Sequence, residues 1–185
     1  MSDLRPTKEL FVFGEEKFRL LFSIQTIDEI QSELNLPIFD AIGVLMKAAR
    51  TDVSEEIIRN YVGILAAVIN SNGKRKVSIR QATEYLNEEN YVVTALRLVE
   101  LFWKCMPEAD DYDPDDEEEH DEQEKETEKS INVANIVYIG CTVLGYRERE
   151  VFEMTLRKFY LLHDQHLIAK GAKQEDIDDD DMFKD

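Results

Sequence analysis

The chain has 185 residues, of which 43% are hydrophobic and 34% are charged, and its formal net charge is -18. This composition supports a packed core in one ordinary domain or two small ones. Two cysteines exclude a disulfide framework and fit a reducing compartment. No run approaches the roughly 18 apolar residues that span a bilayer, and the first residues lack a signal-peptide layout. We therefore expect an intracellular, soluble protein.

The negative charge lies in two segments. Residues 108–130 hold 14 acidic and 2 basic residues, a balance of -12, and residues 175–185 hold 7 acidic and 1 basic, a balance of -6. These two balances account for the whole net charge, so the rest of the chain is neutral. Because duplex recognition needs a net basic footprint, this distribution argues against direct nucleic-acid binding.

Residues 1–107 are predicted to form a β-hairpin followed by a helical bundle domain. Strand-forming runs at 10–13 and 18–22 flank a turn that contains glycine, which is typical of a hairpin. Thr26 is expected to cap the first helix, and Pro37 lies where a second helix begins. The apolar stripe predicted for this second helix consists of Phe39, Ile42, Leu45, Met46 and Ala49.

Three further helices are predicted before Pro107. Ser54 should cap a long helix, and Ser78 with Gln81 has the spacing of a capping box at the start of a short helix. The last helix should end at about Met106. The inward-facing residues predicted for the long helix are Ile57, Ile58, Tyr61, Leu65, Val68 and Ile69. The apolar residues of the last helix are Val92, Leu96, Val99, Phe102, Trp103 and Met106.

Residues 108–130 are interpreted as an acidic flexible linker. Like charges at this density repel one another and cannot bury apolar area, so this segment is the predicted domain boundary. The same reasoning predicts an acidic disordered tail at 172–185.

A small C-terminal helical module is predicted at 131–171. Ser130 or Asn132 should cap its first helix, and Thr155 should cap its last. A short helix carrying Val151 and Phe152 is expected between them. About 40 residues are too few for a stable core, so the module should need docking or a partner.

The residues that could carry chemistry do not form a catalytic set. His163 and His166 stand three apart on a helix, but no thiolate or carboxylate set completes a metal site, so we interpret them as surface or partner-facing. Cys105 and Cys141 lie among apolar residues that bury a thiol, which favours core cysteines over nucleophiles. The acidic tail lacks the glycine and glutamate of a calcium loop. We expect no enzyme activity, no cofactor and no metal.

Short motifs in both halves carry a family resemblance. They are Leu36-Pro37-Ile38-Phe39-Asp40-Ala41, Asn87-Glu88-Glu89-Asn90, Leu144-Gly145-Tyr146, Val151-Phe152-Glu153-Met154-Thr155 and Arg157-Lys158-Phe159-Tyr160-Leu161-Leu162. Together they resemble the two-domain tail assembly chaperones of long non-contractile-tailed bacteriophages, over about residues 9–106 and 131–170. One departure is Phe152, where members of that family often carry tryptophan.

The resemblance implies a non-catalytic protein that binds and solubilises the phage tape measure protein and recruits tail tube subunits. It also implies action in the host cell cytoplasm and absence from the mature virion. Self-association is a further expectation, and the charge distribution and the lack of a long apolar run argue against nucleic-acid and membrane partners. Amphipathic helices can cover the apolar stripes of a long helical partner. The expected partner-binding residues are Leu144, Tyr146, Val151, Phe152, Met154, Phe159 and Tyr160.

Two alternatives come from other classes. The first is an acidic regulator, such as an antitoxin or a nucleic-acid mimic, whose charge runs occupy a basic partner. Deleting 108–130 and 175–185 would abolish the binding of a mimic and spare the helical contacts of a chaperone. The second is a small metal-dependent hydrolase, which would retain a metal through purification.

Overall fold

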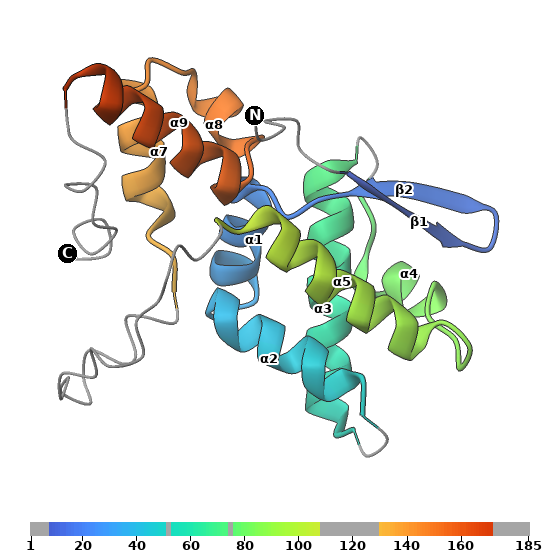
Figure 1. Cartoon of the computed structure of the whole chain (residues 1–185). Helices are drawn as coiled ribbons and strands as arrows, with labels where there is room; N and C mark the ends of the chain where they lie inside the picture. The colour runs from blue at the N-terminus through green and yellow to red at the C-terminus, as the bar shows by residue number, and fades with distance from the viewer. Residues whose placement is uncertain (1–7, 51–52, 74–75, 108–129, 172–185) are drawn as a thin grey trace, which may run out of the picture.

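The computed structural model describes residues 8–50, 53–73, 76–107 and 130–171 (Figure 1). Within them the fold is mainly helical with an N-terminal antiparallel hairpin, which confirms the predicted fold class. The predicted acidic tail and all of the acidic linker except Ser130 lie outside the described residues. The elements are β1 (Glu9–Phe13), β2 (Glu16–Leu20), α1 (Ile24–Glu33), α2 (Ile38–Ala48), α3 (Glu55–Asn72), α4 (Ile79–Glu84), α5 (Tyr91–Cys105), α7 (Val133–Thr142), α8 (Glu148–Phe152) and α9 (Leu156–Ala169).

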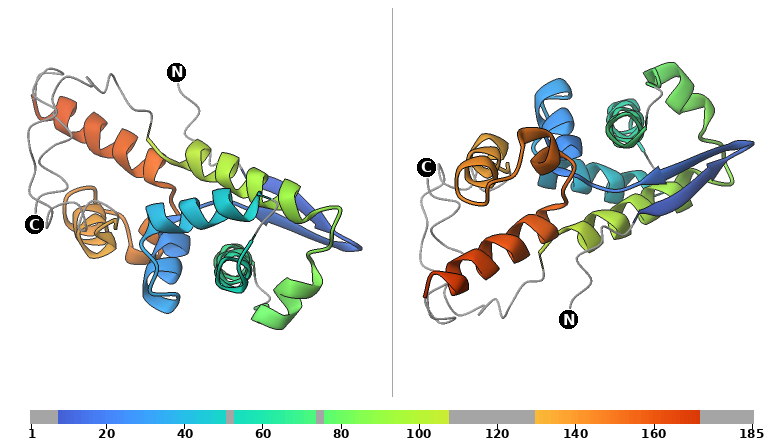
Figure 2. Two further views of the ribbon diagram at one scale, coloured as in Figure 1. Left: turned by 90° about the horizontal axis from the view of Figure 1, so that it is seen from below. Right: turned by 90° about the horizontal axis from the view of Figure 1, so that it is seen from above.

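Helix α3 is the centre of the first half. Nine consecutive residues, 61–69, are buried, because α1, α2, α4 and β2 all pack around this helix. Figure 2 shows α3 end-on, between α1 and α4. Gly63 admits the side chain of Leu34, whose Cδ2 would lie only 3.1 Å from a Cβ at that position. Ile58 is exposed, so the prediction that it faces inward is wrong.

The hairpin is stabilised by the packing of its buried face and by contacts with α5. Phe11 and Phe13 are buried, and the ring of Phe13 stacks on that of Tyr85 at 5.4 Å. The Arg97 guanidinium lies 4.2 Å from the Phe11 ring centroid and donates a 2.8 Å hydrogen bond to the carbonyl of Leu10. A two-stranded hairpin is marginal alone, so these contacts stabilise it. Its register pairs Glu9 with Leu20, Leu10 with Arg19, Phe11 with Phe18, Val12 with Lys17 and Phe13 with Glu16.

Most of the predicted helix caps are present, with one correction. Ser54, Ser78, Asn132 and Thr155 each accept a hydrogen bond from a backbone N–H of the first turn that follows. The first helix, however, is capped by Ser23, one turn before the predicted Thr26. Thr26 is instead the third helical residue and completes a capping box with Ser23. Its buried hydroxyl also lies 2.6 Å from Ser71 Oγ, which ties α1 to the end of α3.

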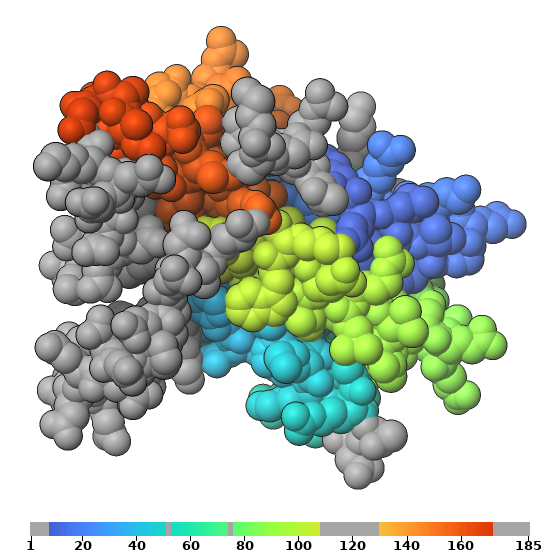
Figure 3. Space-filling view, in the orientation of Figure 1, coloured from blue at the N-terminus to red at the C-terminus, as the bar shows by residue number. Residues whose placement is uncertain are grey.

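Helix α5 is apolar on two sides, and the predicted apolar stripe lies largely on the exposed one. Val92, Leu96 and Trp103 are 40%, 53% and 54% exposed. Figure 3 shows α5 on the front surface of the molecule. Met46 of the predicted α2 stripe is exposed as well. The buried residues of α5 are Thr94, Ala95, Leu98, Leu101, Phe102 and Cys105.

The C-terminal module consists of α7, α8 and α9. It lies beside α1 and the C-terminal end of α5 (Figures 1 and 2). Gly140 of α7 lies against Val151 of α8, and the carbonyl of Gly140 accepts a hydrogen bond from the N–H of Tyr146. A left-handed Gly145, with φ of +75°, follows the end of α7 as the leucine–glycine motif predicts. The module therefore has its own turns but shares its packing with the first half.

Candidate functional site

The predicted partner-binding residues belong to the C-terminal module, which contacts the first half of the chain. The N–H of Ile24 donates a 2.8 Å hydrogen bond to the carbonyl of Met154. Gln31 bonds both backbone polar groups of Ile131. In addition α1 packs against α7 and α8, and α5 packs against α9. The module, predicted to need docking or a partner, thus docks on its own chain.

The seven predicted partner-binding residues divide into two groups. Val151, Met154, Phe159 and Tyr160 are buried, with exposures from 0% to 8%. Leu144, Tyr146 and Phe152 are half-buried and pack against the core from its edge. In this conformation only the second group offers side-chain surface to a partner.

A cleft of about 500 Å³ opens between the two halves. Tyr146 and Met154 are the two predicted residues that line it, and Phe152 does not. The hydroxyls of Ser23 and Ser71 in its wall are both hydrogen-bonded to Thr26, so each already has a hydrogen-bond partner within the protein. The other lining residues are Lys8, Leu21, Asn72, Glu150, Glu153 and Lys158. This mixed lining suits polar contacts and contains neither histidine nor cysteine.

His163 is part of the packing of α9, with a side chain only 12% exposed. The ring of His163 lies parallel to that of Phe159, with centroids 6.3 Å apart, and its Nδ1 is 3.9 Å from Asp164 Oδ1. Burial lowers the pKa of His163, against an opposing effect of the Asp164 carboxylate. Within the described ranges no group of three histidine, cysteine or carboxylate side chains could hold a metal ion.

The two cysteines differ in environment. Cys105 is buried, and burial raises the pKa of its thiol to about 11. A thiol with that pKa is protonated at neutral pH and is a poor nucleophile. Cys141 is only half-buried. The expectation that apolar neighbours bury a thiol and raise its pKa therefore holds for Cys105.

Sequence reasoning missed two features of the surface and the interface. The first is the outward apolar side of α5, which was detectable because the helix carries large apolar residues on two sides. The second is Gln31, a polar residue of an amphipathic helix that no local pattern singles out.

The chain matches no protein-family model, no curated protein and no solved structure. Its function therefore has to be inferred from its own residues and from the resemblance of its motifs. In the part of the chain that the structure describes, no helix is both long and apolar enough to cross a membrane.

Proposed function

We propose that this chain is a non-catalytic phage tail assembly chaperone that binds and solubilises the tape measure protein and recruits tail tube subunits. The observation that carries the proposal is the position of the family motifs in the C-terminal module. Leu144 and Gly145 follow the end of α7, Phe152 is the last residue of α8, and Thr155 caps α9. The order of these motifs along the three helices supports the proposal, although α7 itself ends at Thr142, two residues before Leu144.

The chemistry of the module supports a helical partner. A tape measure precursor presents long apolar helical stripes that must be kept from aggregating, and amphipathic helices can cover such stripes. Leu144, Tyr146 and Phe152 are half-buried and contribute apolar surface at the edge of the module. These side chains can contact a partner without opening the core.

The buried group has a different role in this proposal. Val151 and Phe159 are fully buried, and Met154 accepts the hydrogen bond from Ile24. Removing any of them would destabilise the module before it affected a surface contact. The proposed tape-measure contact is therefore assigned to Leu144, Tyr146 and Phe152, with the buried residues holding these three in place.

The proposal is tested by co-expression with the tape measure protein of the same genome, followed by affinity pull-down of the full chain. The double variant Tyr146→Ala, Phe152→Ala should lose at least about tenfold of the co-purified partner, equivalent to about 1.4 kcal/mol. Tyr138→Ala removes an exposed aromatic from the same module and is the matched control. If the folded double variant co-purifies as much partner as the unmodified chain, the proposed site is wrong. If the unmodified chain forms no complex, the proposed function is wrong.

A further inference from the structure

The exposed side of α5 carries an apolar stripe that nothing in the described residues covers. Val92, Leu96, Val99 and Trp103, here called the α5 stripe, follow one another at spacings of four, three and four residues. Val92, Leu96 and Trp103 are exposed, and Val99 is half-buried. Large exposed apolar patches on monomers are often interaction sites.

We propose that the α5 stripe is the docking site for an amphipathic helix of another protein, one with aliphatic residues at three- and four-residue spacing and basic residues near its ends. This surface lies outside the module to which the tape-measure contact is assigned. The inference defines its partner by chemistry alone and does not depend on the proposed chaperone function.

The geometry of the α5 stripe fits a helix. The residues from Val92 to Trp103 cover about three helical turns, roughly 17 Å. Alternating spacings of three and four residues are the pattern that packs against a second helix crossing at about 20°. Trp103 makes an edge-on ring contact with its buried neighbour Phe102, with centroids 5.2 Å apart. Tryptophan is a typical centre of binding energy at interfaces.

Charges along the α5 stripe are already neutralised within the chain. Glu9 lies 2.6 Å from Lys104 and 3.6 Å from Arg97, and Lys104 lies 2.6 Å from Glu100. These two cations and two carboxylates balance one another. The central part of the α5 stripe should therefore bind an uncharged apolar surface in preference to a strongly charged ligand.

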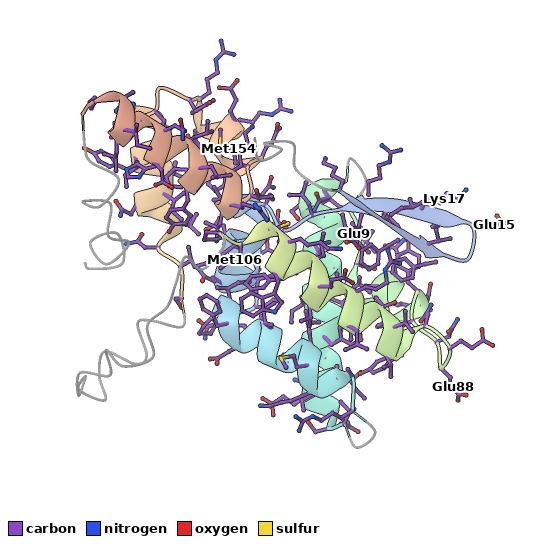
Figure 4. All side chains as sticks on the ribbon, viewed as in Figure 1. Glu9, Glu15, Lys17, Glu88, Met106 and Met154 are labelled. Atoms are coloured by element: carbon purple, nitrogen blue, oxygen red, sulfur yellow. The ribbon has the colours of Figure 1, made fainter. Side chains whose placement is uncertain are left out.

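Acidic sequence flanks α5 on both sides. Glu88 and Glu89 are exposed just before its first turn, and Figure 4 shows Glu88 at the opposite end of α5 from Met106. Past Met106 the sequence continues into residues 108–130, with a balance of -12. A partner helix with lysine or arginine at its ends would complement both regions.

The same charges argue against a second copy of the chain on the α5 stripe. An antiparallel pair of α5 helices would bring the end of α5 of one copy, after which the acidic sequence 108–130 follows, to Glu88 and Glu89 of the other. A parallel pair would bring Glu88 and Glu89 of the two copies together. Either arrangement sets like charges against each other, which opposes association.

The sole tryptophan of the chain, Trp103, reports directly on occupancy of the α5 stripe. The probe is a synthetic peptide of about 18 residues, five helical turns, with leucine at alternating three- and four-residue spacing and lysine at both ends. Titrating it into the full chain should shift the Trp103 emission to the blue and saturate. A scrambled peptide of the same composition should give no saturable shift. An equal shift with the scrambled peptide would overturn the proposal.

Two variants sharpen the test. Leu96→Glu should weaken binding of the leucine–lysine peptide by at least about tenfold. Ile79→Glu places the same charge on α4, where Ile79 is 55% exposed, against 53% for Leu96. This variant should leave binding unchanged. Equal affinities for the two variants would refute the α5 stripe as the site. A dimer of the unmodified chain in sedimentation that Leu96→Glu dissolves would also refute it, by making a second copy the occupant.

The outcomes separate this inference from the proposed function. Loss of peptide binding in Leu96→Glu with normal tape-measure co-purification would leave both standing and assign the α5 stripe to a different helix. Tape-measure binding without any peptide response would support the function and overturn the inference. A peptide response without tape-measure binding would support the inference and contradict the proposed function.

Discussion

The side-chain amide of Gln31 bonds both backbone polar groups of Ile131, a residue 100 positions further along the chain. Gln31 Nε2 donates to the Ile131 carbonyl at 2.9 Å, and the Ile131 N–H donates to Gln31 Oε1 at 2.8 Å. Ile131 is buried at the start of the C-terminal module. One side chain of α1 therefore fixes where the chain enters the module after the acidic segment.

Gln31→Ala should lower the free energy of unfolding by about 1–3 kcal/mol, because it leaves the N–H and carbonyl of Ile131 without their partners. Gln25→Ala is the matched control, since the Gln25 amide bonds only Glu29, within the same helix, at 2.9 Å. That change should cost about 0.5 kcal/mol or less. Urea unfolding of both variants measures the difference. If the two variants lose equal stability, the two hydrogen bonds between Gln31 and Ile131 do not hold the module in place.

Two helix glycines should respond to alanine in opposite directions. A Cβ at Gly140 would lie 2.6 Å from Val151 Cγ2, so Gly140→Ala should cost about 1–3 kcal/mol through overpacking. A Cβ at Gly43 meets nothing within 4 Å, so Gly43→Ala should gain about 0.5–1 kcal/mol from the reduced entropy of the unfolded chain. Thermal unfolding reports both signs.

The cause of the Gly140 effect can be isolated by a double-mutant cycle. In a Val151→Ala background the clashing methyl groups are absent, so Gly140→Ala should cost less than in the unmodified chain. If the cost is the same in both backgrounds, the contact between α7 and α8 is not its origin.

Local signals were predictable from sequence, and long-range placement was not. The caps at Ser54, Ser78 and Thr155 depend on hydrogen bonds within three residues, so their spacing is readable in the chain. Ser23 and Thr26 both have capping chemistry, and they form a reciprocal capping box in which Ser23 is the cap. The capping prediction failed there because threonine stands at the third helical position, where a capping box usually has glutamate or glutamine.

The orientation of α5 shows a second limit. Leu96 and Leu98 are equally apolar, yet Leu98 is buried and Leu96 is exposed. With large apolar residues on both sides, periodicity alone does not say which side meets α2. The docking of the C-terminal module was not predictable from sequence patterns either, because its anchors are the side chain of Gln31 and the backbone N–H of Ile24.

The two cysteines should react with thiol reagents at different rates. The raised pKa of Cys105 keeps its thiol protonated at about pH 8, and burial limits access. Cys141→Ser, which retains only Cys105, should therefore label much more slowly than Cys105→Ser under native conditions. Denaturant should equalise the rates. Fast native labelling of Cys105 would contradict its buried position.

Stability should fall as the solution is acidified below the ordinary histidine pKa of about 6.5. Because burial lowers the pKa of His163 in the folded chain, the unfolded chain binds its proton more readily, so acidification favours unfolding. His163→Gln should reduce the loss of stability between about pH 7.5 and 5.5. Gln165→Asn, at an exposed and non-titrating position of the same helix, controls for the substitution itself. An unchanged pH dependence in His163→Gln would refute the assignment.

The proposed chaperone function is tested most directly by the solubility of the tape measure protein made with and without this chain in the same cells. The account predicts that the tape measure protein is largely insoluble alone, becomes soluble with the full chain and co-purifies with it. The Tyr146→Ala, Phe152→Ala variant should rescue much less of it at equal expression. A tape measure protein that is equally soluble or insoluble in both cases, with no complex formed, would contradict the proposed function.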